Sequence, residues 1–552
     1  MKFSKVLLTV FYFLCAFSIN ASKAALPFQA NTVESKFEPK DVQEVKLNST
    51  FRLSPALVPS HYDIQLRPIL EEVEGSDDVL FTAPGKVTIV FFCANETDTI
   101  VVHSRRLVIF PDTVQVASST GVPVPIAKQE PKVEDDTYVI NTASNLTRNT
   151  EYTLTISYLA NMDGQDGLNG LYRAYYVDEE GKTHNLAATH MEPTRARKAF
   201  PCFDEPGLKA QFIIRLGRRS NYYTLSNTVI INTEGIPEMP GWVWDIYEET
   251  VPMSTYLVAA VVSDLVNVEA EEGFYEKPVR IWATKKLIED GAGDYAAEVA
   301  ARTLKFFEYY FDVVYSLAKM DSVAIPQFSP GAMENWGLNL YRENLLLIFP
   351  GITSEFEKHD VANVIGHELA HQWFGNRVTC KWWSDIWLNE GFATYLSYES
   401  EEQIGPEFEP SKRFFTEVVQ KALKADVLPT THPIHNPSLE TVNVSPLFFD
   451  GIAYEKAGSV IRMFERVFGK REFIARLFLY LFEMKFKAAE QDDLFSRLDD
   501  RSGPYLPPGM TAKLFFDSWT LKSGYPLVRV TKISNNVGFI SQVNTFLIEI
   551  LH

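Results

Sequence analysis

The sequence predicts a multidomain α+β protein in which a mainly-β part precedes a mainly helical part. A chain of 552 residues is too long for one hydrophobic core, and usual domain sizes suggest about three domains. Short runs of alternating apolar and polar residues dominate up to about residue 268, and the spacing becomes helical from about Val279. Hydrophobic residues make up 46% of the chain, which favours packed domains over disorder.

The first 22 residues are predicted to be a cleaved signal peptide. Lys2 and Lys5 precede an apolar run, Val6–Ile19, and the small residues Ala21 and Ser22 offer a cleavage region. The apolar run is shorter than the roughly 20 residues that a membrane span needs. We therefore expect the chain to enter the secretory pathway and to act outside the cell or at its surface.

Residues 23–50 are polar and lack periodicity, so they are predicted to be a linker. Residues 51–268 are predicted to form an N-terminal β domain, because alternating segments are separated by turns rich in Gly, Asn, Asp and Pro. The clearest strands are Tyr62–Leu66, Val87–Phe91 and Tyr152–Ile156. Sequons starting at Asn48, Asn95 and Asn145 are compatible with a glycoprotein.

Residues 269–523 are predicted to form a second, helical domain. Its clearest helices are expected at Ala296–Phe311, Asp360–Phe374, Leu388–Tyr398 and Ser411–Leu423. For the second of these helices, Asp360 is the expected N-cap, and Gly375 with Asn376 is the expected stop signal. The third helix places Glu390 in its first turn.

The most informative motif lies at the end of the Asp360–Phe374 helix. His367 and His371 are four residues apart, so they point two imidazoles from one helix face towards a single cation. A third ligand, Glu390, leaves the fourth position of a tetrahedral zinc open for water, as a catalytic site needs. Glu368 is then placed to take the proton of that water, so the pattern predicts hydrolysis with one zinc per chain.

A second motif, Gly331–Gly337, reads Gly-Ala-Met-Glu-Asn-Trp-Gly. Together with His367–His371, this loop resembles the zinc aminopeptidases of the aminopeptidase N type, the gluzincin aminopeptidase family. Further blocks match in the order of the family, and they are Glu192–Thr194, Ala199–Pro206, Met253–Leu257, Asn389–Ala393 and Phe449–Tyr454. The resemblance implies a saddle-like N-terminal β domain, a thermolysin-like zinc catalytic domain and the start of a β-sandwich.

The resemblance also implies roles for the loop. An enzyme that removes N-terminal residues must recognise a free α-ammonium group, and a fixed carboxylate near the zinc can do so through a charge-assisted hydrogen bond. In the family the loop glutamate has this role, here Glu334, and Glu192 matches the second acidic position. The remaining substrate-binding residues implied by the motif are Gly331, Ala332, Met333 and Asn335. Tyr454 matches the tyrosine whose hydroxyl stabilises the oxyanion.

The C-terminal segment, residues 524–552, begins a new β pattern at Leu527–Val530. Twenty-nine residues are too few for a β-sandwich with its own core, so we expect an incomplete sandwich in a C-terminally truncated chain. Membrane association is then expected only through an anchor in the missing part. The sequence does not determine the oligomeric state.

Composition narrows the range of molecules that the protein is expected to bind. A net charge of −19 disfavours nucleic acid, and peptides with a free N-terminus are the expected substrates. Three cysteines, Cys93, Cys202 and Cys380, remain after signal cleavage and are expected to be buried thiols. Two alternatives stay open: a thermolysin-like endopeptidase that shares the zinc site, and an inactive surface or decoy protein.

Overall fold

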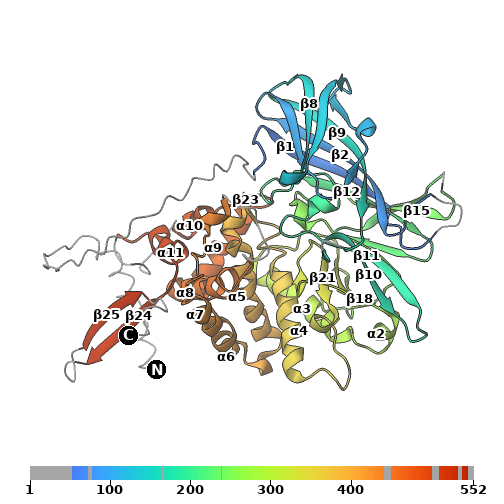
Figure 1. Ribbon diagram of the computed structural model, residues 1–552. Helices are drawn as coiled ribbons and strands as arrows, with labels where there is room; N and C mark the ends of the chain where they lie inside the picture. The colour runs from blue at the N-terminus through green and yellow to red at the C-terminus, as the bar shows by residue number, and fades with distance from the viewer. Residues whose placement is uncertain are drawn as a thin grey trace.

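The computed structural model describes residues 52–72, 77–164, 167–237, 239–440, 449–499, 506, 509–532 and 538–544. The predicted signal peptide, 1–22, and the predicted linker, 23–50, lie outside the described residues. The described residues form a mainly-β N-terminal domain followed by a helical domain, which confirms the predicted α+β class. In Figure 1 the β domain, coloured blue to green, stands above and beside the helices, coloured yellow to orange.

Three sheets build the N-terminal domain. A nine-stranded sheet has the order β14-β15-β12-β1-β2-β9-β5-β6 with β4 paired to β9, a second sheet has the order β3-β8-β7, and a third has the order β10-β11-β16-β13. The strands are β1 (Leu57–Leu66), β2 (Thr82–Cys93), β3 (Thr97–His103), β4 (Val108–Ile109), β5 (Gln115–Ser118), β6 (Pro123–Val124), β7 (Ile126–Lys132), β8 (Thr137–Leu146), β9 (Thr150–Asn161), β10 (Gly170–Val177), β11 (Thr183–His190), β12 (Gln211–Arg219), β13 (Tyr223–Ser226), β14 (Ile230–Gly235), β15 (Trp242–Tyr247) and β16 (Ala260–Ser263). Period-two alternation explains the packing, since Tyr62, Ile64 and Leu66 of β1 are all buried.

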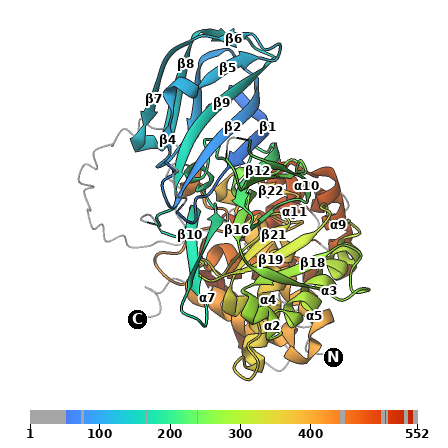
Figure 2. The same cartoon turned by 90° about the vertical axis from the view of Figure 1, so that its right-hand side faces the viewer.

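A five-stranded sheet opens the second domain and has the order β17-β18-β19-β21-β20. Its strands are β17 (Val266–Glu269), β18 (Val279–Ala283), β19 (Met320–Ile325), β20 (Ala332–Met333) and β21 (Leu338–Arg342). Strands β18, β19 and β21 run parallel, whereas β20 pairs antiparallel with β21 and forms the edge. Figure 2 shows this sheet between the β domain above it and helices α2, α3 and α4.

Helices make up most of the remaining chain. They are α2 (Lys285–Glu289), α3 (Asp294–Phe311), α4 (Glu355–Ala370), α5 (Trp387–Ile404), α6 (Pro410–Arg413), α7 (Gln420–Ala425), α8 (Ala457–Phe468), α9 (Lys470–Glu483), α10 (Gln491–Asp499) and α11 (Ala512–Thr520). Two π-helical segments are η8 (Phe414–Val419) and η11 (Ile452–Lys456), so the helix predicted at Ser411–Leu423 is divided among α6, η8 and α7. Two short strands, β22 (Thr379–Cys380) and β23 (Ala488–Ala489), pair in parallel. They join the segment after α4 to the segment between α9 and α10.

The start of α4 differs from the prediction. Asp360 lies inside the helix, and the N-cap is Ser354, whose hydroxyl accepts a hydrogen bond from the Glu357 backbone while the Glu357 carboxylate accepts one from the Ser354 backbone. This reciprocal pair is a capping box, and it lengthens the helix by about one and a half turns at its N-terminus. The helix ends at Ala370 rather than at the expected Phe374.

The C-terminal strands β24 (Pro526–Lys532) and β25 (Gly538–Asn544) form an antiparallel hairpin that contains the strand predicted at Leu527–Val530. In Figure 1 this hairpin projects away from α11. Within the described ranges, every helix is too short or too polar to cross a membrane. The three described cysteines, Cys93, Cys202 and Cys380, are free and buried, as the sequence predicts.

Candidate metal and substrate site

The C-terminal end of α4 carries two of the predicted metal ligands. His367 lies in its last turn, and His371 is the first residue after it. The Nδ1 atom of His371 lies 2.9 Å from the Phe374 carbonyl, to which it donates, so Nε2 is the ring nitrogen that faces the site. The tight turn needs Gly375, which has φ +122° and whose Cβ, if present, would lie 2.9 Å from His371 Nδ1.

The third predicted ligand, Glu390, lies in the first turn of α5 as predicted. Its Oε2 atom is 3.2 Å from Nε2 of His367 and 3.2 Å from Nε2 of His371, and the two Nε2 atoms are 3.1 Å apart. Ligands bound at 2.0–2.1 Å to a tetrahedral zinc lie roughly 3.3–3.4 Å from one another. The three donor atoms therefore fit a zinc ion closely, and their chemistry, two imidazoles and one carboxylate, also fits zinc.

Four carboxylates, those of Glu192, Glu334, Glu368 and Glu390, crowd this site. Glu334, Glu368 and Glu390 are buried, and burial raises the pKa of Glu334 to about 7. Burial also raises the pKa of Glu368 well above its usual range, although the nearby His371 offsets part of the effect. By contrast, Glu390 has a pKa of about 2, because the attraction of the two histidines outweighs the effect of burial. The excess of negative charge makes the site attractive to cations.

The predicted substrate-binding loop forms the edge of the five-stranded sheet. Ala332 and Met333 make up β20, which pairs with Tyr341 and Leu340 of β21. The carbonyl of Gly331, just before the strand, accepts a hydrogen bond of 3.0 Å from the backbone of Arg342. The other side of β20 has no strand partner among the described residues, so an extended peptide could add there by backbone hydrogen bonds.

Glu192 approaches Glu334 from the N-terminal domain, just beyond the end of β11. Carboxylate oxygens of Glu192, Glu334 and Glu390 all lie within 4.8 Å of one another. One oxygen of Glu192 and one of Glu334 are buried and make no hydrogen bond. Burial, and then repulsion by Glu334, raises the pKa of Glu192 well above its usual range. The groups around these two carboxylates therefore do not fully neutralise their negative charge.

Side chains that the sequence reasoning missed hold the loop in place. Nε2 of Gln372 donates to the Glu334 carbonyl at 3.2 Å, and Nδ2 of Asn376 donates to the same oxygen at 2.8 Å. Nε2 of Gln372 also donates to the backbone carbonyl of Glu368 at 3.0 Å, so this one side chain connects the loop to α4. The sequence feature that could have identified Gln372 is its position next to His371. Asn335 is fully buried, with its amide nitrogen 3.4 Å from the Leu257 carbonyl of the β domain.

Tyr454 lies on the π-helical segment η11 and completes the wall of the site. Its ring is parallel to that of His367, with the centroids 6.0 Å apart and an interplanar angle of 11°. Burial raises the pKa of its hydroxyl well above the usual value, and the carboxylates around it act in the same direction. The phenol is therefore a neutral hydrogen-bond donor. Single π-turns of this kind are frequent at functional sites.

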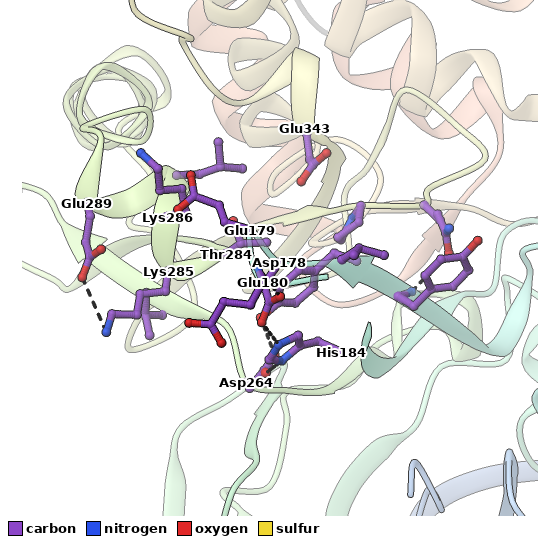
Figure 3. A pocket seen from close by; sticks show the side chains of 17 residues that line it. Asp178, Glu179, Glu180, His184, Asp264, Thr284, Lys285, Lys286, Glu289 and Glu343 are labelled. Carbon is purple, nitrogen blue, oxygen red and sulfur yellow. Dashed lines mark hydrogen bonds and ion pairs between the residues drawn. The ribbon is translucent and has the colours of Figure 1, made fainter. Parts of the chain in front are cut away.

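A separate cavity of about 750 Å³ lies at the carboxyl ends of β18, β19 and β21 (Figure 3). The predicted site residues do not line it. One of its lining residues, His184, lies between Asp178 (Nε2–Oδ2 2.8 Å) and Asp264 (Nδ1–Oδ2 2.5 Å). The His184 ring stacks on Tyr176 at 4.7 Å. This histidine ties the β10–β11 hairpin to the segment that follows β16.

Comparison with known proteins agrees with this arrangement. Residues 58–257 match the peptidase M1 N-terminal domain, and residues 295–519 match the peptidase family M1 domain. The chain is 34% identical to aminopeptidase N of Rattus norvegicus over 529 residues, which are 94% of this chain and 54% of that protein. It is 34% identical to aminopeptidase N of Homo sapiens over 535 residues (95% and 53%), and 32% identical to endoplasmic reticulum aminopeptidase 1 of Rattus norvegicus over 510 residues (89% and 53%).

The chain thus spans about half the length of the curated relatives it matches. The two matched domains follow each other in the chain and contain all the predicted site residues. Both ligand-bearing helices, the β20 loop and Tyr454 fall within the second match, and Glu192 falls within the first. The chain therefore belongs to peptidase family M1.

Proposed function

We propose that this protein is a zinc metallo-aminopeptidase that hydrolyses the N-terminal peptide bond of peptides. The observation that carries the proposal is the pair of carboxylates, Glu192 and Glu334, beside the triangle of His367, His371 and Glu390. An endopeptidase needs only the triangle and a base, because an internal peptide bond presents no charge. Two carboxylates that each hold a buried oxygen without a hydrogen bond fit a cationic group of the substrate, and the α-ammonium is the charge that every free N-terminus carries.

The chemistry follows from the positions of these groups. Zinc bound by His367, His371 and Glu390 would supply a Lewis acid and lower the pKa of a bound water to about 7. Glu368, which directly follows the ligand His367 on α4, is the proposed base that takes the proton of the attacking water and delivers it to the leaving amine. The neutral hydroxyl of Tyr454 donates to the carbonyl oxygen as negative charge develops there.

Substrate alignment is proposed to use the free edge of β20. A peptide that adds to this edge gains backbone hydrogen bonds whatever its sequence, while Glu334, which directly follows the strand, fixes its first residue. Gly331 and Ala332 keep the approach open because they carry little or no side chain. We include Met333 and Asn335 in the substrate-binding loop. Asn335 would act by holding the loop against the β domain rather than by touching the peptide.

The proposed location is the secretory pathway, outside the cell or at its surface. The apolar run Val6–Ile19 behind Lys2 and Lys5 supports a signal peptide. The name of one relative, endoplasmic reticulum aminopeptidase 1, also points to this pathway. Glycosylation at Asn95 or Asn145 would follow from such a route, and a mass shift on enzymatic deglycosylation of the secreted chain would test it.

The experiment that tests the proposed function combines metal analysis with a matched pair of substrates. We expect the purified chain to hold one zinc per molecule and to release the chromophore from an aminoacyl anilide. The same anilide with an acetylated amine should be a far poorer substrate, because acetylation removes the charge that Glu192 and Glu334 recognise. Equal rates on both substrates would favour an endopeptidase, and a zinc-loaded chain without activity on either would contradict the proposal.

A further inference from the structure

The two helices that carry the candidate metal ligands are antiparallel. His367, near the end of α4, faces Glu390 at the start of α5, and His359, nearer the start of α4, faces Glu401 near the end of α5. His359 precedes His367 by eight residues, or about 12 Å along the helix axis. The helix pair is therefore joined at two levels, once at the metal site and once at the His359 level.

The contacts at the second level are well defined. Nδ1 of His359 is 2.7 Å from Oε1 of Glu401, and Nε2 of His359 is 3.3 Å from Oε2 of Glu417 on η8. The side chains of His359 and Glu401 are only 1% and 2% exposed. Glu417 is held in turn by the Tyr398 hydroxyl (2.9 Å) and by Arg413 (3.1 Å). One histidine thus connects α4 with α5 and with η8.

The charge state of His359 follows from its two partners. A neutral imidazole has one N–H and can satisfy only one carboxylate, whereas an imidazolium can satisfy both. Burial alone would lower the pKa of His359, but the attraction of Glu401 outweighs burial and raises it. The Nδ1–Oε1 approach is off the line of a hydrogen bond, so the contact is chiefly an ion pair. The other charged groups near His359 are Asp360 and Arg413.

Further contacts continue from this ion pair towards the metal ligands. Nδ2 of Asn363 donates to Oε2 of Glu401 at 3.1 Å, and the Ser397 hydroxyl lies 3.4 Å from Oδ1 of Asn363. At Gly366, next to His367, a Cβ would lie 2.7 Å from the Ser400 hydroxyl. The helices therefore touch closely along this whole stretch. A movement of α4 along the axis of α5 would therefore disrupt all of these contacts at once.

A buried ion pair gains little stability over apolar residues of the same size, and its best-attested role is to fix the register of packed helices. We infer that His359 and Glu401 are positioning residues that set the axial register of α4 against α5, and so hold His367, His371 and Glu390 at the separations that suit zinc. The inference rests on the proposed function, because it concerns the same metal ligands. Neither residue belongs to the proposed ligand set or to the proposed substrate-binding residues.

The test measures zinc affinity as well as catalysis in the full chain. His359→Gln and Glu401→Gln each remove the charge attraction and nearly keep the volume. We expect each variant to raise the zinc Kd about tenfold, measured by competition with a chromophoric chelator, and to lower kcat by about 10- to 100-fold. The KM for an aminoacyl anilide should stay within twofold, since Glu192 and Glu334 are untouched. The double variant should lose no more than the stronger single variant, because the two side chains act as one contact.

His184→Gln is the matched control, because His184 also lies between two carboxylates but sits on β11, away from the metal helices. It should leave the zinc Kd and kcat unchanged. Folded His359→Gln and Glu401→Gln variants with wild-type zinc Kd would overturn this inference alone. So would additive losses in the double variant, or an equal loss in His184→Gln. If His359→Gln does not fold, Asn363→Ala replaces it under the same criteria. A wild-type chain that binds no zinc would instead overturn the proposed function.

Discussion

Replacing Glu334 by glutamine should separate amine recognition from metal binding. Glu334 is 3% exposed and one of its carboxylate oxygens has no hydrogen bond, so the substitution removes a charge without removing a structural partner of that oxygen. Gln372 and Asn376 hold the backbone carbonyl of Glu334 and not its side chain, so the loop should keep its position. Zinc content should therefore remain at one per chain.

The size of the effect follows from the bond that is lost. A hydrogen bond to a charged group contributes about 1.5–3 kcal/mol, and each 1.4 kcal/mol corresponds to a tenfold change. Glu334→Gln should thus lower kcat/KM for an aminoacyl anilide by about 10- to 150-fold. Glu343→Gln is a suitable control, because Glu343 is a partly buried carboxylate at the end of the neighbouring strand β21, where it lines the separate cavity. Its activity should stay within twofold of wild type.

The decisive measurement is the sensitivity to acetylation. In the wild-type chain, blocking the substrate amine should reduce kcat/KM by at least as much as the Glu334 substitution does. In Glu334→Gln the same block should matter much less, because the charge that it removes no longer has its main partner. If both proteins were equally sensitive to acetylation, Glu334 would not be the amine anchor, and the exopeptidase reasoning would fail.

Four further predictions concern the remaining groups. His371→Ala should lower zinc content steeply, and stoichiometric zinc in this variant, measured by atomic absorption, would remove His371 from the ligand set. Glu368→Gln should keep zinc but lose turnover by about 10²–10⁴-fold, so near-normal kcat would exclude it as the base. Tyr454→Phe should lower kcat by about 10²–10³-fold with little change in KM, and the reverse pattern would reassign Tyr454 to binding. The raised pKa of His184 stabilises the fold below its ordinary pKa of about 6.5, and this contribution is lost as pH rises through the folded value; His184→Gln should therefore show a flatter fall of Tm above pH 6.5 than wild type.

Local sequence rules were sufficient to bring His367, His371 and Glu390 together, but they did not predict the residues that support these three. The i, i+4 spacing places His367 and His371 on one face, and the first-turn position of Glu390 follows from the start of α5. The start of α4 was mispredicted because Asp360 is also a good N-cap residue. The Ser354–Glu357 pair carries the stronger signal, since only a capping box satisfies two backbone donors at once.

The pair of carboxylates that we propose to bind the amine could not be predicted from spacing. Glu192 and Glu334 lie 142 residues apart in the sequence and come from different domains. Physical reasoning from the residues alone would assign Glu192 to an ordinary polar surface position. Only the family resemblance indicated it, whereas the structure places its carboxylate within 4.8 Å of those of Glu334 and Glu390.

The same limit explains why the His359–Glu401 contact was missed. Each residue taken alone looks like a polar position on an amphipathic helix, and nothing in the spacing relates 359 to 401. The antiparallel packing of α4 and α5 makes the two residues neighbours, and it does so because His367 and Glu390 already meet at the other level. Once two ligands from different helices must share one cation, the register of those helices becomes part of the metal site. By this proposal, residues that fix the register act on the chemistry from a distance of about two to three helical turns, without touching a reacting atom.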